Sequence, residues 1–95
     1  MAAKVVLVTG ATNGIGYETV KAFLQSENSY HVYLGSRSVE KGKTALQKIQ
    51  EECRGSKNTV EILQIDLTSD ESIEKAFETI KNGPGRVDVL IHNAG

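Results

Sequence analysis

The chain has 95 residues, of which 39% are hydrophobic and 24% are charged, and its net charge is -1. This length allows one domain at most, and the near-neutral charge gives no electrostatic reason to expect nucleic acid or a membrane surface as a partner. The single cysteine, Cys53, excludes an internal disulfide framework, and no apolar run is long enough for a signal peptide or a membrane span. We therefore expect a globular protein of the reducing cytoplasm.

A glycine-rich turn follows the first predicted strand. The strand covers Lys4–Thr9, and helical periodicity begins at Ile15 and continues to about Glu27. In the turn between them, Gly10 lets the chain reverse and Gly14 leaves room for a phosphate near the backbone, while Gly16 lets the helix pack close to the sheet. A diphosphate would then lie at the helix N-terminus, where the first amides have no partner within the helix.

The rest of the chain continues to alternate strand and helix. Further strands are expected at Tyr30–Gly35, Val60–Ile65 and Val87–Ile91. Ser38 is expected to cap a second helix, and the capping-box pattern Thr68-Ser69-Asp70-Glu71 opens a third helix that ends near Asn82. The inward faces are expected to carry Ile15, Thr19, Ala22 and Phe23 in the first helix, Leu46, Ile49 and Cys53 in the second, and Ile73, Ala76, Phe77 and Ile80 in the third.

This alternation predicts an α/β fold, a Rossmann-like, doubly wound parallel sheet with four strands and three helices. The expected strand order is third, second, first, fourth, with the first two helices on one face and the third on the other. One helix covers four strands sparsely, so residues drawn from Val5–Val8 and Val87–Ile91 are expected to stay largely exposed. The fold is incomplete, since a further strand normally pairs with the fourth.

Three stretches resemble the short-chain dehydrogenase/reductase family. The octet Thr9-Gly10-Ala11-Thr12-Asn13-Gly14-Ile15-Gly16 is similar to the family's Thr-Gly-x-x-x-Gly-x-Gly motif, and Asp66-Leu67 and His92-Asn93-Ala94-Gly95 are similar to its Asp-Leu pair and its Asn-Asn-Ala-Gly. The resemblance implies an oxidoreductase with a nicotinamide dinucleotide cofactor. It assigns to that cofactor Gly10, Thr12, Asn13, Gly14, Ile15, Gly16, Asp66, Leu67, Asn93, Ala94 and Gly95.

The resemblance also implies individual roles. Asp66 would accept a hydrogen bond from the adenine amino group, with the Leu67 amide facing the ring. The alternative is that Asp66 simply begins the turn into the next helix. The backbone of Asn93-Ala94-Gly95 would line the ribose, and His92 stands where the family has its first Asn, so side-chain hydrogen bonding at that corner is left open.

The residue type at the end of the second strand distinguishes the two nicotinamide cofactors. An acid there favours NAD and an arginine favours NADP, and this chain has Arg37 between Ser36 and Ser38. A cation just before a helix N-terminus is disfavoured by the helix dipole unless an anion such as a 2′-phosphate binds there. Arg37 therefore favours NADP over NAD, the alternative being a solvated surface arginine. Asn13 stands where some NADP-preferring members carry a second basic residue.

Tyr17 and Lys21 have the Tyr-x-x-x-Lys spacing of the family's proton donor. We interpret this spacing as coincidence, because this helix begins at the diphosphate end of the cofactor and the family's pair lies on a later helix. No catalytic residue is assigned, and no metal site is expected because Cys53, His31 and His92 lack ligand spacing.

The resulting hypothesis is that residues 1–95 form the cofactor-binding N-terminal part of one Rossmann domain. The complete protein would be an NADP-dependent oxidoreductase acting on a small carbonyl or alcohol, and the chain alone is expected to be inactive and to self-associate or unfold easily. Two alternatives stay open: a non-catalytic nucleotide-binding or interaction module, and an inactive truncated product.

Overall fold

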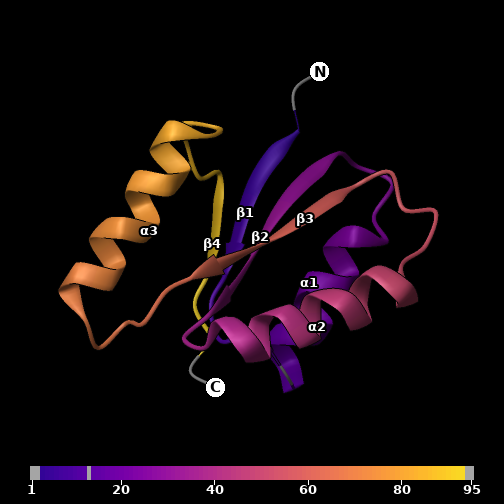
Figure 1. Cartoon of the computed structure of the whole chain (residues 1–95). Helices are drawn as coiled ribbons and strands as arrows, with labels where there is room; N and C mark the ends of the chain where they lie inside the picture. The colour runs from indigo at the N-terminus through magenta and orange to yellow at the C-terminus, as the bar shows by residue number, and fades with distance from the viewer. Residues whose placement is uncertain (1–2, 13, 94–95) are drawn as a thin grey trace.

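The computed structural model describes residues 3–12 and 14–93 and contains one four-stranded parallel sheet (Figure 1). The strand order is β3-β2-β1-β4, as the sequence predicts. The elements in chain order are β1 (Lys4–Val8), α1 (Gly14–Leu24), β2 (Tyr30–Ser36), α2 (Val39–Glu52), β3 (Thr59–Gln64), α3 (Asp70–Asn82) and β4 (Val89–Ile91). None of the helices in the described residues is long and apolar enough to cross a membrane.

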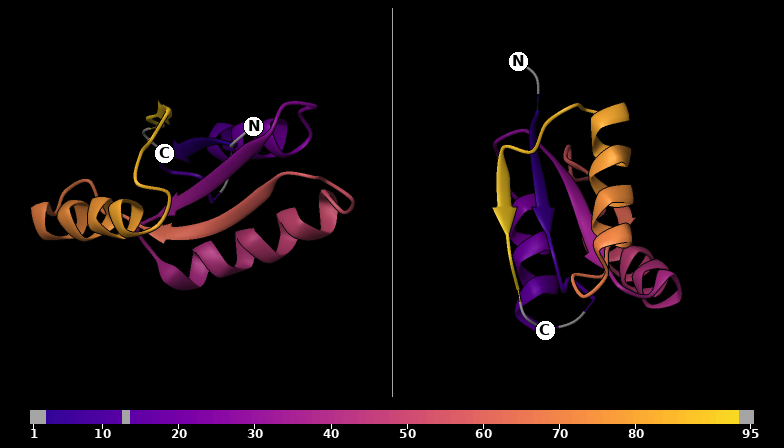
Figure 2. Two further views of the ribbon diagram at one scale, coloured as in Figure 1. Left: turned by 90° about the horizontal axis from the view of Figure 1, so that it is seen from above. Right: turned by 90° about the vertical axis from the view of Figure 1, so that its left-hand side faces the viewer.

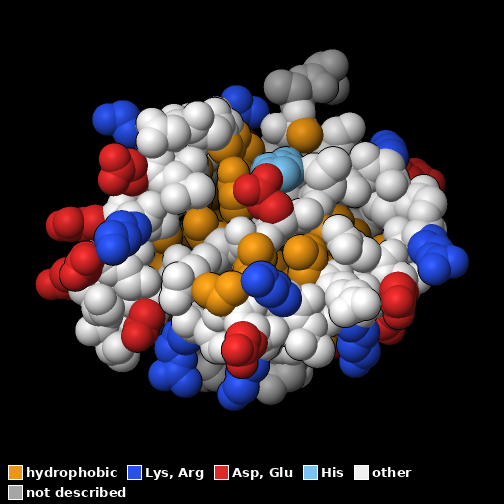
Figure 3. All heavy atoms as spheres, in the orientation of Figure 1, with side chains coloured by type: hydrophobic (Ala, Val, Ile, Leu, Met, Phe, Trp, Pro, Cys, Tyr) orange, Lys and Arg blue, Asp and Glu red, His pale blue; other side chains and the backbone are white. Residues whose placement is uncertain are grey.

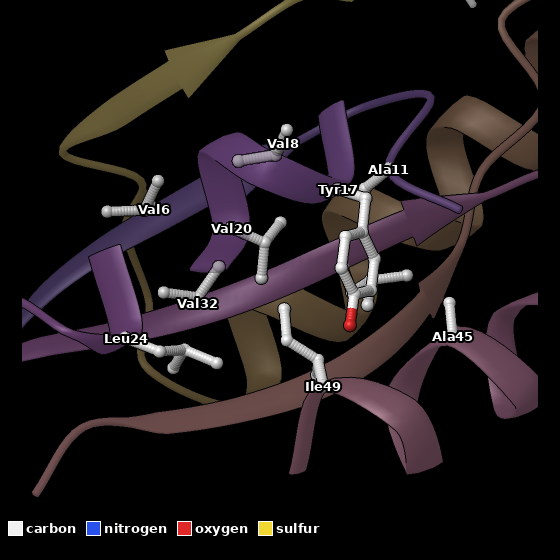
Figure 4. Packing of buried hydrophobic residues seen from close by; sticks show 10 residues of the cluster. Val6, Val8, Ala11, Tyr17, Val20, Leu24, Val32, Ala45 and Ile49 are labelled. Atoms are coloured by element: carbon white, nitrogen blue, oxygen red, sulfur yellow. The ribbon is translucent and has the colours of Figure 1, made fainter. Parts of the chain in front are cut away.

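The helices divide between the two faces of the sheet, as expected. In the left-hand view of Figure 2, α3 lies to the left of α1 and α2, and the buried residues form separate cores on the two faces. The larger core lies under α1 and α2 and is shown in Figure 4; its buried members are Val6, Val8, Ala11, Tyr17, Val20, Leu24, Val32, Leu34, Ala45 and Ile49. The smaller core lies under α3 and comprises Val5, Leu7, Tyr33, Leu63, Ile65, Ala76 and Ile80.

Most of the predicted inward face of α1 is wrong, although Phe23 is half-buried and packs against the larger core. Ile15 is 78% exposed and Ala22 is also exposed, whereas Val20 and Leu24 are buried together with Gly16 and Tyr17. Both sets of residues have helical spacing, so periodicity alone does not choose between them. The close approach of Gly16 to the preceding turn determines which stripe is buried, because it turns the side of α1 that carries Gly16, Val20 and Leu24 toward the sheet.

The C-terminal end of α1 is also earlier than predicted, at Leu24 instead of Glu27. Asn58, which is buried, holds the chain after the helix: its Nδ2 donates to the carbonyls of Phe23 at 2.9 Å and Ser26 at 3.2 Å. Its Oδ1 accepts from the Tyr30 amide at 2.9 Å. One side chain therefore joins the end of α1 to the start of β2.

The other two helices begin at serine caps. Ser38 accepts from the Lys41 amide, as predicted, and Ser69 accepts from the Ser72 amide. The expected capping box beginning at Thr68 is wrong, because the cap is one residue later and its partner is Ser72 instead of Glu71.

Two further positions on the expected inward faces are less buried than predicted. Phe77 is 44% exposed and does not belong to the inward stripe of α3, whose buried residues are Ala76 and Ile80. On α2, Leu46 is half-buried, beside a stripe formed by Gly42, Ala45 and Ile49.

On the face of the sheet that α3 covers, strand residues of β1 and β4 were both expected to be exposed. The structure shows this exposure on β4 but not on β1. Val5 and Leu7 are buried because they contact the core under α3, whereas Leu90 is 56% exposed. In the space-filling view, hydrophobic side chains are visible at the surface next to α3 (Figure 3). The strand β4 is also shorter than predicted: before Val89, the Asp88 carboxylate accepts from the Val5 amide at 2.8 Å and takes part in the pairing with β1.

We predict that Asn58→Ala destabilises the protein by about 1 to 3 kcal/mol, because it leaves the Phe23 and Ser26 carbonyls and the Tyr30 amide without their partner. Urea unfolding measures the change. Asn28→Ala, at an exposed position of the same connection, is the control and should change the free energy of unfolding by less than about 0.5 kcal/mol. Equal effects of the two substitutions would contradict this role of Asn58.

Candidate functional site

The carboxyl ends of the four strands surround an open hollow of about 510 Å³. Parallel strands bring the residues that follow them to one edge of the sheet, which is where doubly wound sheets bind ligands. The residues that line it are Thr9, Gly10, Thr12, Ser36, Arg37, Ser38, Lys41, Ile65, Asp66, Leu67, Thr68, His92 and Asn93.

The glycine turn forms one wall of the hollow. Gly10 and Gly14 have φ values of 60° and 61°, a backbone region that other residues rarely adopt. A Cβ atom at Gly16 would lie 2.2 Å from the Gly10 carbonyl oxygen, so only glycine allows the first turn of α1 to come this close. The turn thereby places the N-terminus of α1 beside the ends of β1 and β4, and the first amides of an α-helix have no acceptor within the helix itself.

Hydrogen bonds tie the end of β4 to this turn. Asn93 Nδ2 donates to the Gly10 carbonyl at 3.1 Å, and the Asn93 amide donates to Thr9 Oγ1 at 3.1 Å. His92 Nδ1 lies 3.3 Å from the same Thr9 hydroxyl. The position that holds His92 therefore takes part in side-chain hydrogen bonding, which the sequence left open, and buried Thr9 is the residue it meets.

Two basic side chains line the opposite part of the hollow. Arg37 follows β2 directly, and Lys41 lies in the first turn of α2. Among the residues that the structure describes, neither forms an ion pair with a carboxylate. Sequence reasoning missed Lys41; the signal was a second cation four residues after Arg37, at a helix start where the dipole disfavours cations.

Asp66 faces the basic side chains from the end of β3. Its Oδ1 accepts from the Thr68 hydroxyl at 2.7 Å and from the Thr68 amide at 3.0 Å. These two bonds, and the nearby Arg37 charge, lower the pKa of the Asp66 carboxyl below its ordinary value. The carboxylate is therefore ionised at neutral pH and is held in one orientation at the rim of the hollow.

The structure brings together six of the residues that the sequence analysis predicted to bind a cofactor, either from the family resemblance or, for Arg37, from its place at the end of the second strand. Gly10, Thr12, Arg37, Asp66, Leu67 and Asn93 all line the hollow. Gly14 and Ile15 belong to the adjoining N-terminus of α1, with the Ile15 side chain directed into a second groove, and Gly16 packs under the turn. Asn13, Ala94 and Gly95 lie outside the described residues, and the contacts of the marked residues with a cofactor stay predictions.

Tyr17 and Lys21 are engaged elsewhere. The buried Tyr17 hydroxyl donates to the carboxylate of Glu52 on α2, and Lys21 Nζ lies 3.3 Å from the same carboxylate. Burial, together with the hydrogen bond to Glu52, raises the pKa of Tyr17 well above its ordinary value. A tyrosine that serves as a proton donor near neutral pH needs a lower pKa, so this arrangement fits a connection between α1 and α2.

Within residues 3–12 and 14–93, no cluster of three metal-ligating side chains is present.

A family model described as short chain dehydrogenase matches residues 4–95. This match spans the glycine turn, the Asp66 region and the end of β4. The chain belongs to the short-chain dehydrogenase/reductase family. Members of this family are oxidoreductases, and the four-stranded Rossmann-like sheet matches part of a solved structure of a short-chain reductase.

Individual members support this assignment. The chain is 41% identical over 92 residues to the short-chain dehydrogenase/reductase tropE of Talaromyces stipitatus, with 97% of this chain and 35% of that protein covered. Its structure resembles menthone neomenthol reductase from Mentha piperita, with a TM-score of 0.84 and 28% identity over 100% of this chain and 32% of that one. It also resembles L-sorbose reductase from Gluconobacter frateurii complexed with NADPH and L-sorbose, with a TM-score of 0.81 and 26% identity over 99% of this chain and 34% of that one. The chain therefore spans about a third of the length of these three proteins.

We predict that Thr68→Val raises the pKa of Asp66 toward the ordinary value for aspartate, because it removes the hydroxyl bond that favours the ionised form. NMR titration of the Asp66 carboxyl measures the shift. A lowered pKa in the folded state adds stability that is present above the unfolded pKa of about 4 and is lost as the pH falls through the folded value. The difference in stability between parent and variant should therefore shrink on acidification, and an unchanged Asp66 pKa in the variant would contradict the assigned bond.

Proposed function

We propose that this chain is the cofactor-binding N-terminal part of an NADP-dependent oxidoreductase. In the full-length protein, a hydride would pass between the nicotinamide of NADP and a small carbonyl or alcohol substrate. Residues 1–95 would form one portion of a single Rossmann domain, supplying the adenine, ribose and diphosphate end of the site.

The observation that carries the choice of NADP is the pair of cations at the end of β2. Arg37 and Lys41 both line the hollow, next to the N-terminus of α2, and the described residues provide no carboxylate ion pair for either. Two cations beside the positive end of a helix repel that end and each other, and an anion between them removes this cost. A 2′-phosphate is the anion that distinguishes NADP from NAD.

The other walls of the hollow suit the remaining parts of the dinucleotide. The N-terminus of α1 offers amides for the diphosphate, and the positive φ of Gly14 and the open space around it leave the backbone accessible there. The Asp66 carboxylate can accept a hydrogen bond from the adenine amino group, with the 42% exposed Leu67 beside it. Asn93 holds the end of β4 against Gly10, where the ribose would lie.

The comparison with L-sorbose reductase gives independent support. That enzyme was solved with NADPH and L-sorbose, and it superposes on nearly all of this chain. Its identity of 26% is low, so the support for NADP comes mainly from Arg37 and Lys41. The substrate of the full-length protein depends on residues outside this chain.

We predict that Arg37→Asp reverses the preference for NADPH over NADH. The substitution removes a charge-assisted contact with the 2′-phosphate and places a carboxylate where it can accept from a ribose hydroxyl, so NADPH affinity should fall by about 10- to 100-fold. Lys41→Ala should weaken NADPH by a smaller factor and leave NADH unchanged. Parallel binding titrations of the full-length protein and its variants with NADPH and with NADH measure both effects.

Arg54→Asp provides the matched control for this experiment. It makes the same charge change at an exposed arginine just after α2, outside the residues that line the hollow. It should leave the ratio of the two affinities unchanged. Equal affinities for the two cofactors in the parent, or an Arg54→Asp effect as large as that of Arg37→Asp, would reject the proposal.

We also predict that Tyr17 and Lys21 are not the proton-transfer pair. In the full-length protein, Tyr17→Phe and Lys21→Ala should leave turnover within a few fold of the parent, since a positioned acid is worth about 100- to 10,000-fold. Thermal melts should show a lower Tm for both variants, because both remove contacts with Glu52. A loss of turnover in the larger range with unchanged cofactor affinity would show that the pair is catalytic.

A further inference from the structure

Gly42 is a buried glycine in the first turn of α2. Glycine is a poor helix former, because it loses more backbone freedom on folding than any other residue. Backbone conformation does not explain its use here, since Gly42 does not have a positive φ. The reason must therefore lie in what surrounds it.

Gly42 lies directly against the sheet. A Cβ atom on it would lie 2.2 Å from Cδ1 and 2.9 Å from Cγ1 of Ile62, and 3.2 Å from Cβ of Ser36. Rotation about the Ile62 Cβ–Cγ1 bond can move Cδ1 aside, but it leaves the other two atoms in place. Ile62 belongs to β3 and Ser36 ends β2, so the absence of a side chain at Gly42 lets α2 begin close to both strands.

Three hydrogen bonds hold the segment that leads into α2. The buried Ser36 hydroxyl donates to the Ser38 carbonyl at 2.7 Å, and the Gly42 amide donates to the same carbonyl at 2.9 Å. From β3, Gln64 Nε2 donates to the Arg37 carbonyl at 3.4 Å. Because Gly42 is bonded to Ser38, a displacement of Gly42 from the sheet would also move the backbone next to Arg37.

This geometry determines where the two cations of the hollow lie. Arg37 comes one residue before Ser38, Lys41 comes one residue before Gly42, and both cations line the hollow. Charge-assisted hydrogen bonds to phosphate are short and directional, so they weaken when their donors move away. Lifting the first turn of α2 from the sheet would therefore move both cations together, whereas the glycine turn before α1 would stay where it is.

We propose that Gly42 is a positioning residue for NADP specificity. By letting the first turn of α2 lie against Ile62 and Ser36, it places Arg37 and Lys41 so that both reach one phosphate. Gly42 itself is not among the residues that line the hollow, so its effect is indirect. The inference rests on the proposed function, because it takes this phosphate to be the 2′-phosphate of NADP.

The test compares NADPH and NADH binding to the full-length protein that carries Gly42→Ala. The affinity for NADPH should fall by about three- to tenfold, because both cations are displaced but still present. The affinity for NADH should stay the same, because NADH has no phosphate at this position. Thr44→Ala creates the same residue type on the exposed side of α2, outside the hollow, and as the matched control it should change neither affinity.

A double variant distinguishes positioning from a general loss of structure. Ile62→Ala removes both Ile62 atoms that the added methyl group would meet. In the Ile62→Ala background, Gly42→Ala should therefore lower NADPH affinity by less than about twofold, which makes the two substitutions non-additive. Alanine is a better helix former than glycine, so the variants should fold, and thermal melts check this.

Three results would overturn the inference: an unchanged ratio of the two affinities in Gly42→Ala, an equal loss for NADPH and NADH, or an NADPH loss that persists in full in the Ile62→Ala background. Arg37→Asp, measured in parallel, separates this inference from the proposed function. If Arg37→Asp reverses the cofactor preference and Gly42→Ala leaves it unchanged, only the positioning role of Gly42 is rejected. If Arg37→Asp also leaves the preference unchanged, the proposed function fails.

Discussion

The contact on which most of this structure depends is the approach of Gly16 to the carbonyl of Gly10. A Cβ atom at residue 16 would lie 2.2 Å from that oxygen and 2.7 Å from Asn93 Nδ2, so no other residue type fits without moving backbone. Asn93 donates to the same carbonyl oxygen, which joins the turn to the end of β4. One small space thus fixes the start of α1, the end of β1 and the end of β4 relative to one another.

The orientation of α1 about its own axis follows from this contact. With Gly16 against the turn, Tyr17, Val20 and Leu24 enter the core, and the Tyr17 hydroxyl reaches Glu52 on α2. The same contact brings the first turn of α1 close to the ends of β1 and β4. A single steric constraint therefore determines both which stripe of the helix is buried and where the helix dipole is directed.

The sequence determined the layout of this fold better than its details. Strand order and the division of helices between faces follow from the alternation and from crossover handedness, and both were predicted correctly. The buried face of α1 was not, because its two apolar stripes have the same period and the choice depends on a tertiary contact. Val5 and Leu7 were expected to be exposed and are buried, since α3 covers β1 more fully than a count of helices suggests.

The residues of the candidate site likewise fall into those that the sequence predicted and those that it did not. Local motifs marked Gly10, Asp66 and Asn93 for the strand ends, where they now line one hollow. Lys41 and the buried Asn58 carried no such motif: the first acts through its place at a helix start, and the second through three hydrogen bonds to segments 28 to 35 residues away. Roles that depend on distant partners become visible only when those partners are placed.

The electrostatics of the hollow give a physical reason why its ligand should be an anion with an uncharged polar end. Arg37 and Lys41 lie near the positive end of α2, and the N-terminus of α1 adds a second positive dipole end across the strand ends. Asp66 is the carboxylate among the lining residues, and Thr68 holds it at the rim by two hydrogen bonds. Its fixed oxygens therefore favour a hydrogen-bond donor such as an amino group, while the two helix ends and the two cations favour phosphate. A ligand that satisfies all of these groups must carry its negative charges toward α1 and α2 and its neutral donor toward β3, which is the polarity of an adenine dinucleotide with a phosphorylated ribose.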